Sequence, residues 1–233
     1  MVTKASRPLT RSKQDYLKAL NALAPGAETV TTSRLAEHLG VSAPSVTSML
    51  GKLAGERLVR HAPRAGARLT ARGRREAIAM VRRHRILETF LVRVLGFDWS
   101  EVHADAEVLE HHISDRVLEA IDRLIGHPGE DPHGHPIPDR SGRMTRRELQ
   151  PLASLAEGAS AVVREIRDQD GPRMMRWKQA GLVPGARVRV REVRTLDDVF
   201  AIEVEGRPLV ITGSEGLDGV LVEPGHGGRP RVA

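Results

Sequence analysis

Residues 31–70 read TTSRLAEHLGVSAPSVTSMLGKLAGERLVRHAPRAGARLT, and their pattern predicts the fold of the first third of the chain. A short segment with helical apolar spacing ends at Gly40, and in the next segment Pro44 occupies a first-turn position, where its missing N–H costs little. Two short helices joined by a turn of about three to four residues form a helix-turn-helix. Residues 58–70 have apolar ends and a tip with Pro and Gly, which predicts a β-hairpin and therefore a winged arrangement.

The remainder of the first 125 residues is predicted to be mostly helical. Helical spacing of apolar residues gives a first helix over about residues 11–24, which Pro25-Gly26 ends. A long helix is predicted over about residues 71–95. After a break at the next glycine, a further helix is predicted over about residues 101–124.

The last hundred residues have a different character. Residues 126–142, GHPGEDPHGHPIPDRSG, contain four prolines and four glycines and are therefore predicted to be a loop. Alternating apolar residues between 188 and 211, with turns at Asp197-Asp198 and Gly206, predict short antiparallel strands. The Gly-, Pro- and Arg-rich end of the chain predicts a disordered tail. The predicted fold class is mainly α with a small β domain.

Composition limits the chemistry that the chain can perform. Its 233 residues include no cysteine, so any metal must be held by histidine and carboxylate, and a reducing compartment is expected. No stretch approaches the roughly 18 to 20 apolar residues of a membrane span, and the beginning of the chain lacks the apolar region of a signal peptide. We therefore expect a cytoplasmic protein with no membrane partner.

The charge is unevenly distributed along the chain. The net charge of +6 is compatible with a polyanionic partner. Ten arginines lie between Arg57 and Arg85, where Glu76 is the only acidic residue. Residues 98–122 are instead acidic and contain histidine. A basic segment that could bind a polyanion is thus followed by an acidic segment that could bind a cation.

The second helix of the helix-turn-helix begins with small hydroxyl residues, at the end where a recognition helix meets base edges and phosphates. The hairpin that follows carries arginines where a wing would meet phosphates. The candidate DNA-contacting residues are Ser42, Pro44, Ser45, Thr47, Ser48, Arg60, Arg64 and Arg68. The alternative is a structural pair of helices with a Ser-rich cap, and the arginines of the hairpin favour DNA binding.

Two imidazoles and two carboxylates share one face of the predicted helix over residues 101–124, in a stripe about 100° wide. These residues are His103, Glu107, Glu110 and His111. A solvated acidic face is the alternative interpretation. On the preceding helix, however, His84 and Glu88 stand four residues apart and point the same way. Imidazole and carboxylate without thiolate suit Mn²⁺, Fe²⁺, Co²⁺ or Zn²⁺, and six candidate ligands suggest two adjacent metal positions.

The chain resembles the diphtheria toxin repressor family, which includes iron-dependent regulators and manganese transport regulators. The resemblance covers about residues 12–222. It rests on these motifs: Asp15-Tyr16-Leu17, Ser42-x-Pro-Ser-Val46, Arg83-His84-Arg85 with Glu88, Val102-His103, Glu110-His111 with Ser114-Asp115, and the loop from Asp131 to Pro138. Because the loop over residues 126–142 recurs in the family as a linker, its His127, His133 and His135 are interpreted as structural residues.

The resemblance implies a winged helix-turn-helix DNA-binding domain over residues 1–75. It further implies a helical dimerisation and metal-binding domain with a linker over residues 76–143 and an SH3-like β-barrel over residues 144–224, with a disordered tail over residues 225–233. It also implies a regulatory metal site at Asp15, Glu107, Glu110 and His111, and an ancillary site at His84, Glu88 and His103. In some members the SH3-like domain donates a ligand, which is Asp170 in the best alignment, with Asp168 and Gln169 as nearby substitutes.

Two departures from the family pattern bear on the metal. Asp15 and Glu107 stand where iron-responsive members have Met and Cys, and the exchange of soft sulfur for hard oxygen favours Mn²⁺. Lys18, however, stands where manganese-responsive members have Glu, so the nuclearity of the site is left open.

The sequence therefore predicts a homodimeric, Mn²⁺-dependent regulator that binds a double-stranded DNA operator and represses metal-uptake genes. It is predicted not to be an enzyme, to take no small-molecule substrate and to hold two metal sites per subunit. An Fe²⁺-dependent regulator of the same family is the nearest alternative. A two-metal hydrolase would need a general base and an open pocket, and a winged-helix regulator that responds to a small molecule would leave the acidic stripe without a metal.

Overall fold

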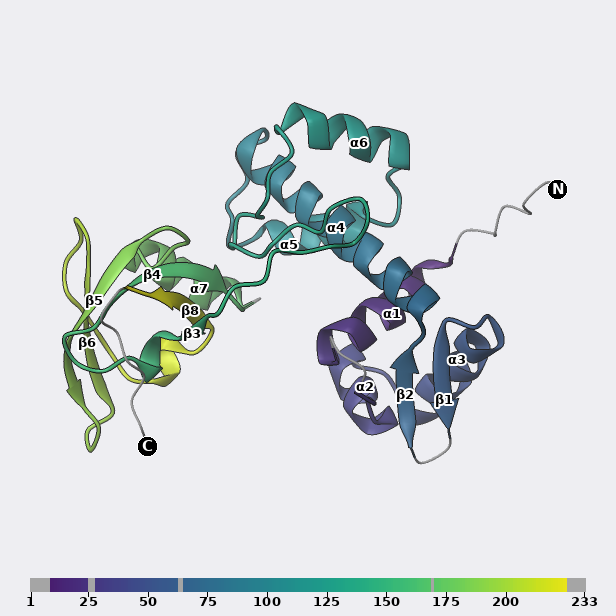
Figure 1. Cartoon of the computed structure of the whole chain (residues 1–233), viewed down its shortest axis with the longest axis horizontal. Helices are drawn as coiled ribbons and strands as arrows, with labels where there is room; N and C mark the ends of the chain where they lie inside the picture. Colours follow the sequence, from purple (N-terminus) through teal and green to yellow (C-terminus); the bar gives the residue numbers. More distant parts are fainter. Residues whose placement is uncertain (1–8, 25–27, 63–64, 169, 226–233) are drawn as a thin grey trace. The chain divides into compact units, whose positions relative to one another are not determined.

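The computed structural model describes residues 9–24, 28–62, 65–168 and 170–225 (Figure 1). They belong to two compact units, which are described in turn. The first unit consists of residues 1–84 and 138–143, and the second of residues 85–137 and 144–233. Among the described residues, no helix has the length and hydrophobicity that crossing a membrane would require.

The first unit begins with a winged helix-turn-helix, as the sequence predicts. Its helices are α1 (Arg11–Leu23), α2 (Thr32–Leu39) and α3 (Ala43–Gly55), and its hairpin consists of β1 (Val59–Ala62) and β2 (Gly66–Leu69). Gly40 ends α2 with a left-handed φ of 63°, and the hydroxyl of Ser42 caps α3 by accepting a hydrogen bond from the Ser45 N–H. These local signals fix the turn that separates the two helices.

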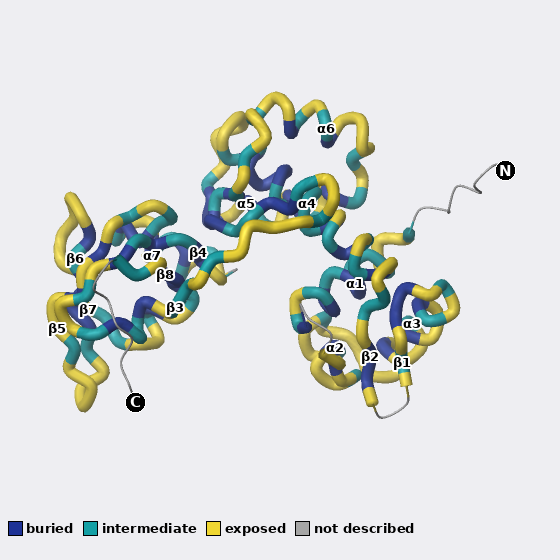
Figure 2. Tube along the Cα trace, in the orientation of Figure 1, coloured by how far each residue is buried: buried dark blue, intermediate teal, exposed yellow. Residues whose placement is uncertain are grey.

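The core of the first unit comes from the inner faces of these elements. Leu17 and Leu20 of α1 and Leu35 of α2 are fully buried. From α3 and the start of the hairpin, the core residues are Val46, Leu50, Leu53 and Leu58. The apolar side of each helix thus faces inward, and the opposite side is left for solvent or a partner (Figure 2).

Helix α4 (Ala71–Arg93) begins in the first unit and continues into the second. The second unit adds α5 (Val102–Leu109) and α6 (Asp115–Leu124), followed by the loop from residue 126 to 142. That loop contains no helix or strand beyond an isolated bridge between Glu130 and Pro136, as its prolines and glycines predict.

The single helix predicted over residues 101–124 is wrong. Helix α5 ends at Leu109, Glu110 is its C-cap residue, and His111 follows in a turn. Helix α6 then starts afresh, because the Ser114 hydroxyl accepts a hydrogen bond from the Val117 N–H and Asp115 lies in the first turn. Of the four residues of the predicted stripe, therefore, only His103 and Glu107 lie within one helix, and Glu110 and His111 lie at or beyond its end.

The C-terminal β domain is an antiparallel sheet with one helix. The strands are β3 (Gln150–Pro151), β4 (Ser160–Ile166), β5 (Arg187–Arg194), β6 (Val199–Val204), β7 (Val210–Thr212) and β8 (Val220–Pro224), accompanied by α7 (Gly171–Ala180). Two single-turn 3₁₀ segments, η1 (Leu152–Ser154) and η2 (Glu215–Leu217), complete it. The sequence did not predict β4, α7 or β8.

The strand order in this sheet is β3-β8-β4-β5-β6-β7. The predicted SH3-like β-barrel is not closed, because among the described strands β3 pairs only with β8 and β7 only with β6. Both edge strands are short, with two and three residues, so they offer few backbone groups with which a closing pair could form. Fold class is otherwise confirmed. The predicted tail, beyond Gly225, lies outside the described residues.

Candidate metal centre and DNA-binding surface

Helix α3 presents the predicted recognition residues to solvent. Val46 and Leu50 are buried on its inner face, whereas the outer face is exposed. The exposed residues include Ser42, Pro44, Ser45, Thr47 and Ser48. A helix N-terminus with exposed hydroxyls offers N–H groups and side-chain donors to phosphate oxygens. The arrangement suits a nucleic-acid partner.

The hairpin places two arginines opposite each other. Arg60 of β1 pairs in register with Arg68 of β2, and both are exposed. Like charges directly opposite each other on neighbouring strands destabilise a hairpin, and a phosphate between them would remove that repulsion. Arg64, the third predicted residue of the wing, lies outside the described residues.

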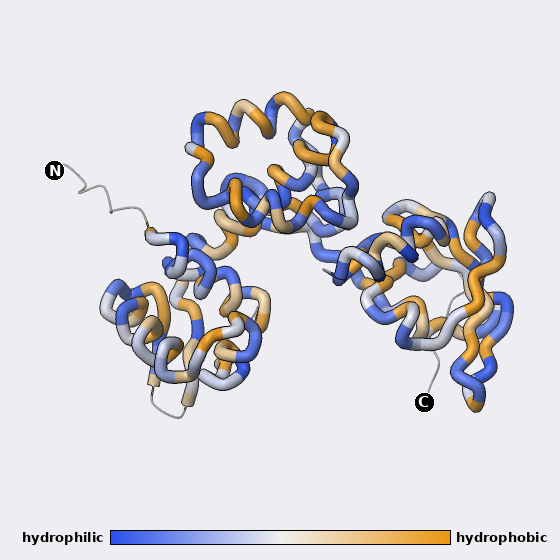
Figure 3. The backbone as a smooth tube through the Cα atoms, turned by 180° about the vertical axis from the view of Figure 1, so that it is seen from behind, coloured by the Kyte–Doolittle hydropathy of each residue, from blue (hydrophilic) through white to orange (hydrophobic). Residues whose placement is uncertain are grey.

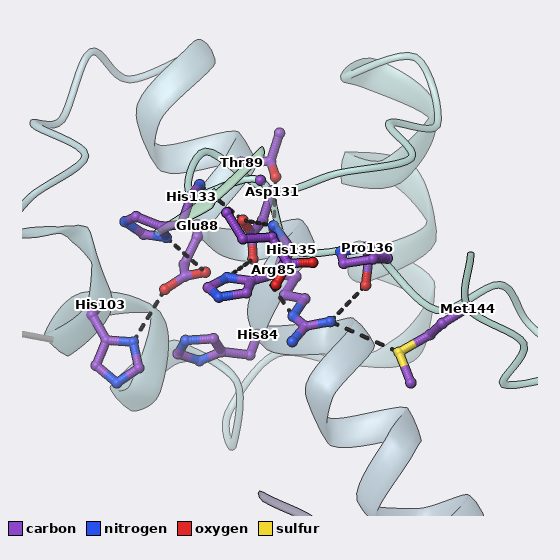
Figure 4. A network of polar contacts seen from close by, with 12 residues as sticks. His84, Arg85, Glu88, Thr89, His103, Asp131, His133, His135, Pro136 and Met144 are labelled. Carbon is purple, nitrogen blue, oxygen red and sulfur yellow. Dashed lines mark hydrogen bonds and ion pairs between the residues drawn. The ribbon is translucent and has the colours of Figure 1, made fainter. Parts of the chain in front are cut away.

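The predicted ancillary ligands lie on α4 and α5. His84 and Glu88 are one turn apart on the same face of α4 and are buried. His103, at the start of α5, has its Nδ1 atom 3.1 Å from Glu88 Oε1 (Figure 4). A buried carboxylate in contact with imidazole nitrogen is a donor set that a divalent cation can use.

Three predicted regulatory ligands lie where α5 ends. Glu107 is half-buried on α5, and Glu110 at its C-cap is buried. The Nε2 atom of His111 is 3.6 Å from Glu110 Oε1, and both side chains are at most 3 % exposed. Groups this polar are seldom buried unless they are paired or coordinate a metal. Their oxygen and imidazole donors fit a first-row divalent ion.

The other predicted regulatory ligand belongs to the first unit. Asp15 is half-buried on α1. Three residues later on the same helix, Lys18 extends toward α4, with its Nζ atom 3.5 Å from His84 Nδ1. The sequence marked Lys18 as a departure from the family pattern but gave no sign of this contact.

Asp170 is exposed at the N-cap position of α7, and its side chain makes no capping hydrogen bond. Its backbone N–H donates to Asp168 Oδ1, and Asp168 also pairs with Arg173 at 3.1 Å. The next residue, Gly171, lines a pocket together with His103. Asp170 thus directly precedes, in the chain, a residue that lines the same pocket as His103. Gln169 lies outside the described residues.

A second cluster of histidine and carboxylate lies in the loop, where Asp131, His133 and His135 bring their donor atoms within 4.8 Å of one another. Here Asp131 Oδ1 accepts the N–H groups of His133 and His135, at 2.8 and 3.0 Å. Its Oδ2 lies 3.5 Å from the guanidinium of Arg85. The Asp131 carboxylate is thus already used to shape the loop and to pair with a half-buried guanidinium.

Contacts with the rest of the second unit fix the position of His133. Its Nε2 donates to the Trp99 carbonyl at 2.7 Å, and its own carbonyl accepts the N–H of Ile166 in β4. Gly134 packs so closely on β4 that a Cβ there would lie 1.8 Å from the Arg164 carbonyl oxygen. Burial lowers the pKa of His133, but the nearby Glu88 and Asp131 outweigh this effect and raise the pKa overall. The sequence gave no indication that Arg85 would pair with Asp131 here.

Three family models match consecutive parts of the chain. The N-terminal DNA-binding domain of iron-dependent repressors matches residues 8–67, and the metal-binding and dimerisation domain of the same repressors matches residues 70–139. The FeoA domain matches residues 150–224. These matches cover the helix-turn-helix, the helices with the candidate ligands and the C-terminal sheet.

Relatives resemble the chain over most of its length. It is 34 % identical over 194 residues to the iron-dependent repressor IdeR of Mycobacterium tuberculosis, a match that covers 78 % of this chain and 84 % of the relative. It is 28 % identical to the diphtheria toxin repressor of Corynebacterium diphtheriae, over 69 % of this chain and 72 % of that one.

A solved manganese-dependent transcriptional repressor in complex with manganese is 38 % identical, with a TM-score of 0.82 and coverage of 91 % of this chain and 99 % of that chain. The manganese regulator SloR is 30 % identical, with a TM-score of 0.70 and coverage of 91 % and 98 %. The chain therefore belongs to the iron-dependent repressor family, the family of the diphtheria toxin repressor, whose members are metal-dependent, DNA-binding transcriptional repressors and not enzymes.

Proposed function

We propose that this chain is a Mn²⁺-dependent repressor of metal-uptake genes. The observation that carries the proposal is the donor set at the end of α5, where buried Glu110 and His111 are joined by Glu107. With no cysteine in the chain, every donor is oxygen or imidazole nitrogen. Carboxylate oxygen is the donor that suits Mn²⁺ better than softer ions. The manganese-dependent repressor at 38 % identity supports the same metal.

The proposed regulatory ligands are Asp15, Glu107, Glu110 and His111, and the proposed ancillary ligands are His84, Glu88 and His103, with Asp170 as a further donor. A divalent cation bound at either site would supply the positive charge that holds the carboxylates and imidazoles of that site together. Asp15 is connected to the DNA-binding domain through α1, because Leu17 and Leu20 of the same helix are part of that domain's core. Ligation of Asp15 would therefore restrict where the recognition helix can lie.

DNA is the proposed target of the exposed side of α3 and of the wing. Ser42, Ser45 and Thr47 can bond phosphates or either base type, and Arg60 with Arg68 supplies positive charge for phosphates. Pro44, Ser48 and Arg64 complete the proposed contact set.

The proposed assembly is a homodimer. The helical part of the second unit leaves large apolar side chains in solvent, and α6 carries apolar residues along its length (Figure 3). The exposed apolar residues of this part are Val94, Leu95, Phe97, Val108, Leu109, Val117 and Leu124. An apolar surface of this kind marks a protein interface, and the family model for this region is that of a dimerisation domain. Two recognition helices can then meet two half-sites on one face of DNA.

We propose functional boundaries at residues 1–75 for DNA binding, 76–143 for dimerisation and metal binding, and 144–224 for the SH3-like domain. An Fe²⁺-dependent repressor is the second candidate, because iron-dependent repressors from mycobacteria share 32–34 % of their residues with this chain.

The test is operator binding at buffered free metal. A DNA ligand is first selected from random duplexes in the presence of Mn²⁺, and fluorescence anisotropy then follows its binding with Mn²⁺, Fe²⁺, Co²⁺ or Zn²⁺. We expect the protein to bind the DNA tightly when free Mn²⁺ is within its physiological range. A chelator should abolish this binding. Binding that does not depend on any metal would refute the proposal, and activation by Fe²⁺ but not Mn²⁺ would favour the second candidate.

A further inference from the structure

Lys18 and His84 contact each other within the first unit, through side chains of α1 and α4. The ammonium nitrogen of Lys18 is 3.5 Å from His84 Nδ1, and the imidazole is only 6 % exposed. A lysine ammonium can only donate hydrogen bonds. Nδ1 must therefore be the acceptor, and the ring proton of a neutral His84 lies on Nε2.

This arrangement leaves His84 poorly prepared to bind a metal. A metal–imidazole bond uses the lone pair of a nitrogen that carries no proton. In His84 the lone pair of Nδ1 is directed at the Lys18 ammonium, and Nε2 holds the proton. Coordination through Nδ1 requires the ammonium to leave, and coordination through Nε2 requires that nitrogen to release its proton.

We propose that Lys18 lowers the metal affinity of His84, because its ammonium competes with a divalent cation for the imidazole. The ammonium acts as a resident cation, so that filling any metal site that includes His84 needs a higher metal concentration than the imidazole alone would need. This inference rests on the proposed function, because it assigns His84 to a metal site.

The charge and the partial burial of Lys18 support the competition. A divalent ion placed beside the ammonium would also meet like charge, which a half-buried position screens less than open solvent does. Lys18 thus opposes a second cation both by hydrogen bonding and by charge.

The consequence is a graded response to metal. The ligands at the end of α5 can be filled while Lys18 still holds His84, and the site that includes His84 fills only at higher metal concentration. A chain with an uncharged residue at position 18 would fill both together.

The test compares Lys18→Met with Lys13→Met in the full-length protein. Lys13 lies on the same helix but pairs with Glu56, so its replacement removes one ammonium of α1 without touching His84. In the metal-free proteins, NMR chemical shifts of the His84 ring nitrogens report which nitrogen carries the proton. Calorimetric titration with Mn²⁺ gives the number and affinity of bound ions.

We expect Lys18→Met to change the chemical shifts of the His84 ring nitrogens. It should also tighten the binding of the weaker-bound Mn²⁺ ion about tenfold, because the Lys18–His84 hydrogen bond no longer has to be broken. Lys13→Met should leave both readouts as in the unchanged protein. Identical shifts and identical Mn²⁺ affinities for the two variants would overturn the inference while leaving the proposed function intact. An unchanged protein that binds no Mn²⁺ would overturn both.

Discussion

Two clusters of histidine and carboxylate in the second unit have similar composition but different surroundings. In the loop, Asp131 accepts two backbone N–H groups and pairs with Arg85, and His133 donates to the Trp99 carbonyl. At the end of α5, Glu110 and His111 bring a carboxylate and an imidazole together with Glu107 close by in sequence. Residue types alone therefore do not identify a metal site, because a guanidinium beside a carboxylate opposes a second cation.

The largest expected effect is on stability, at the loop cluster. Asp131→Ala leaves half-buried Arg85 without its carboxylate and two backbone N–H groups without their acceptor, and the free energy of unfolding should fall by about 3 kcal/mol. Chemical denaturation followed by circular dichroism measures the change.

Asp139→Ala is the matched control, because Asp139 also accepts two backbone N–H groups and pairs with an arginine, but its side chain is 43 % exposed. Asp139→Ala should lower the free energy of unfolding much less than Asp131→Ala. Equal losses at the two positions would mean that burial of Asp131 is not what makes the loop cluster structural.

The second prediction separates the clusters by function. His111→Ala should lose the metal-promoted gain in DNA affinity, which we expect to be about 100-fold, because coupling between two binding sites commonly has this size. His135→Ala in the loop should keep the gain. Fluorescence anisotropy with and without Mn²⁺ compares the two variants, and a His135→Ala protein that no longer responds to Mn²⁺ would show that the loop holds the regulatory metal.

The third prediction concerns the choice of metal. Glu107→Cys replaces an oxygen donor with a thiolate and should shift the ratio of Zn²⁺ to Mn²⁺ affinity about tenfold toward Zn²⁺. His135→Cys introduces the same thiol into the loop cluster and should leave that ratio unchanged. Competition titrations with a metal indicator measure the ratios, and an equal shift in both variants would remove the distinction between the clusters.

The smallest effect is expected beside Trp99, whose carbonyl holds His133. Asp98 pairs with Lys178 at 2.5 Å, and the hydrogen bonds from Lys178 and Ser100 lower its pKa to about 2. Because the ionised form is the stabilising one, its contribution is complete above the unfolded-chain value of about 3.9 and is lost as the pH falls toward 2.

Asp98→Asn should therefore cost less than about 1 kcal/mol at neutral pH, as for other partly exposed ion pairs. Denaturation curves at several pH values measure the cost. A difference from the unchanged protein that persists below about pH 2 would show that the Asp98 charge is not its source.

The helix-turn-helix could be predicted because its signals are local. Gly40 has the backbone freedom to end α2, and Ser42 caps α3 through a residue three positions away. The break between α5 and α6 also had a local signal, Ser114 followed by Asp115. It was missed because no glycine or proline interrupts residues 110–113, and so the helical stripe was extended too far.

The contacts that decide the chemistry of the candidate site could not be predicted. Lys18 and His84 are 66 residues apart in the chain, and Arg85 meets Asp131 across a loop and two helices. Nothing in the local sequence of either partner indicates such pairs, since only the folded chain brings them together. For the same reason, the loop histidines could be interpreted as structural only through the family resemblance.

In the proposed function, metal binding at the end of α5 and DNA binding are coupled. Because coupling between two binding equilibria is reciprocal, the most direct test is the Mn²⁺ affinity of the unchanged protein, measured by electron paramagnetic resonance of free Mn²⁺, with and without the selected DNA. We expect DNA to tighten Mn²⁺ binding by the same factor by which Mn²⁺ tightens DNA binding. An affinity for Mn²⁺ that DNA leaves unchanged would rule out this coupling.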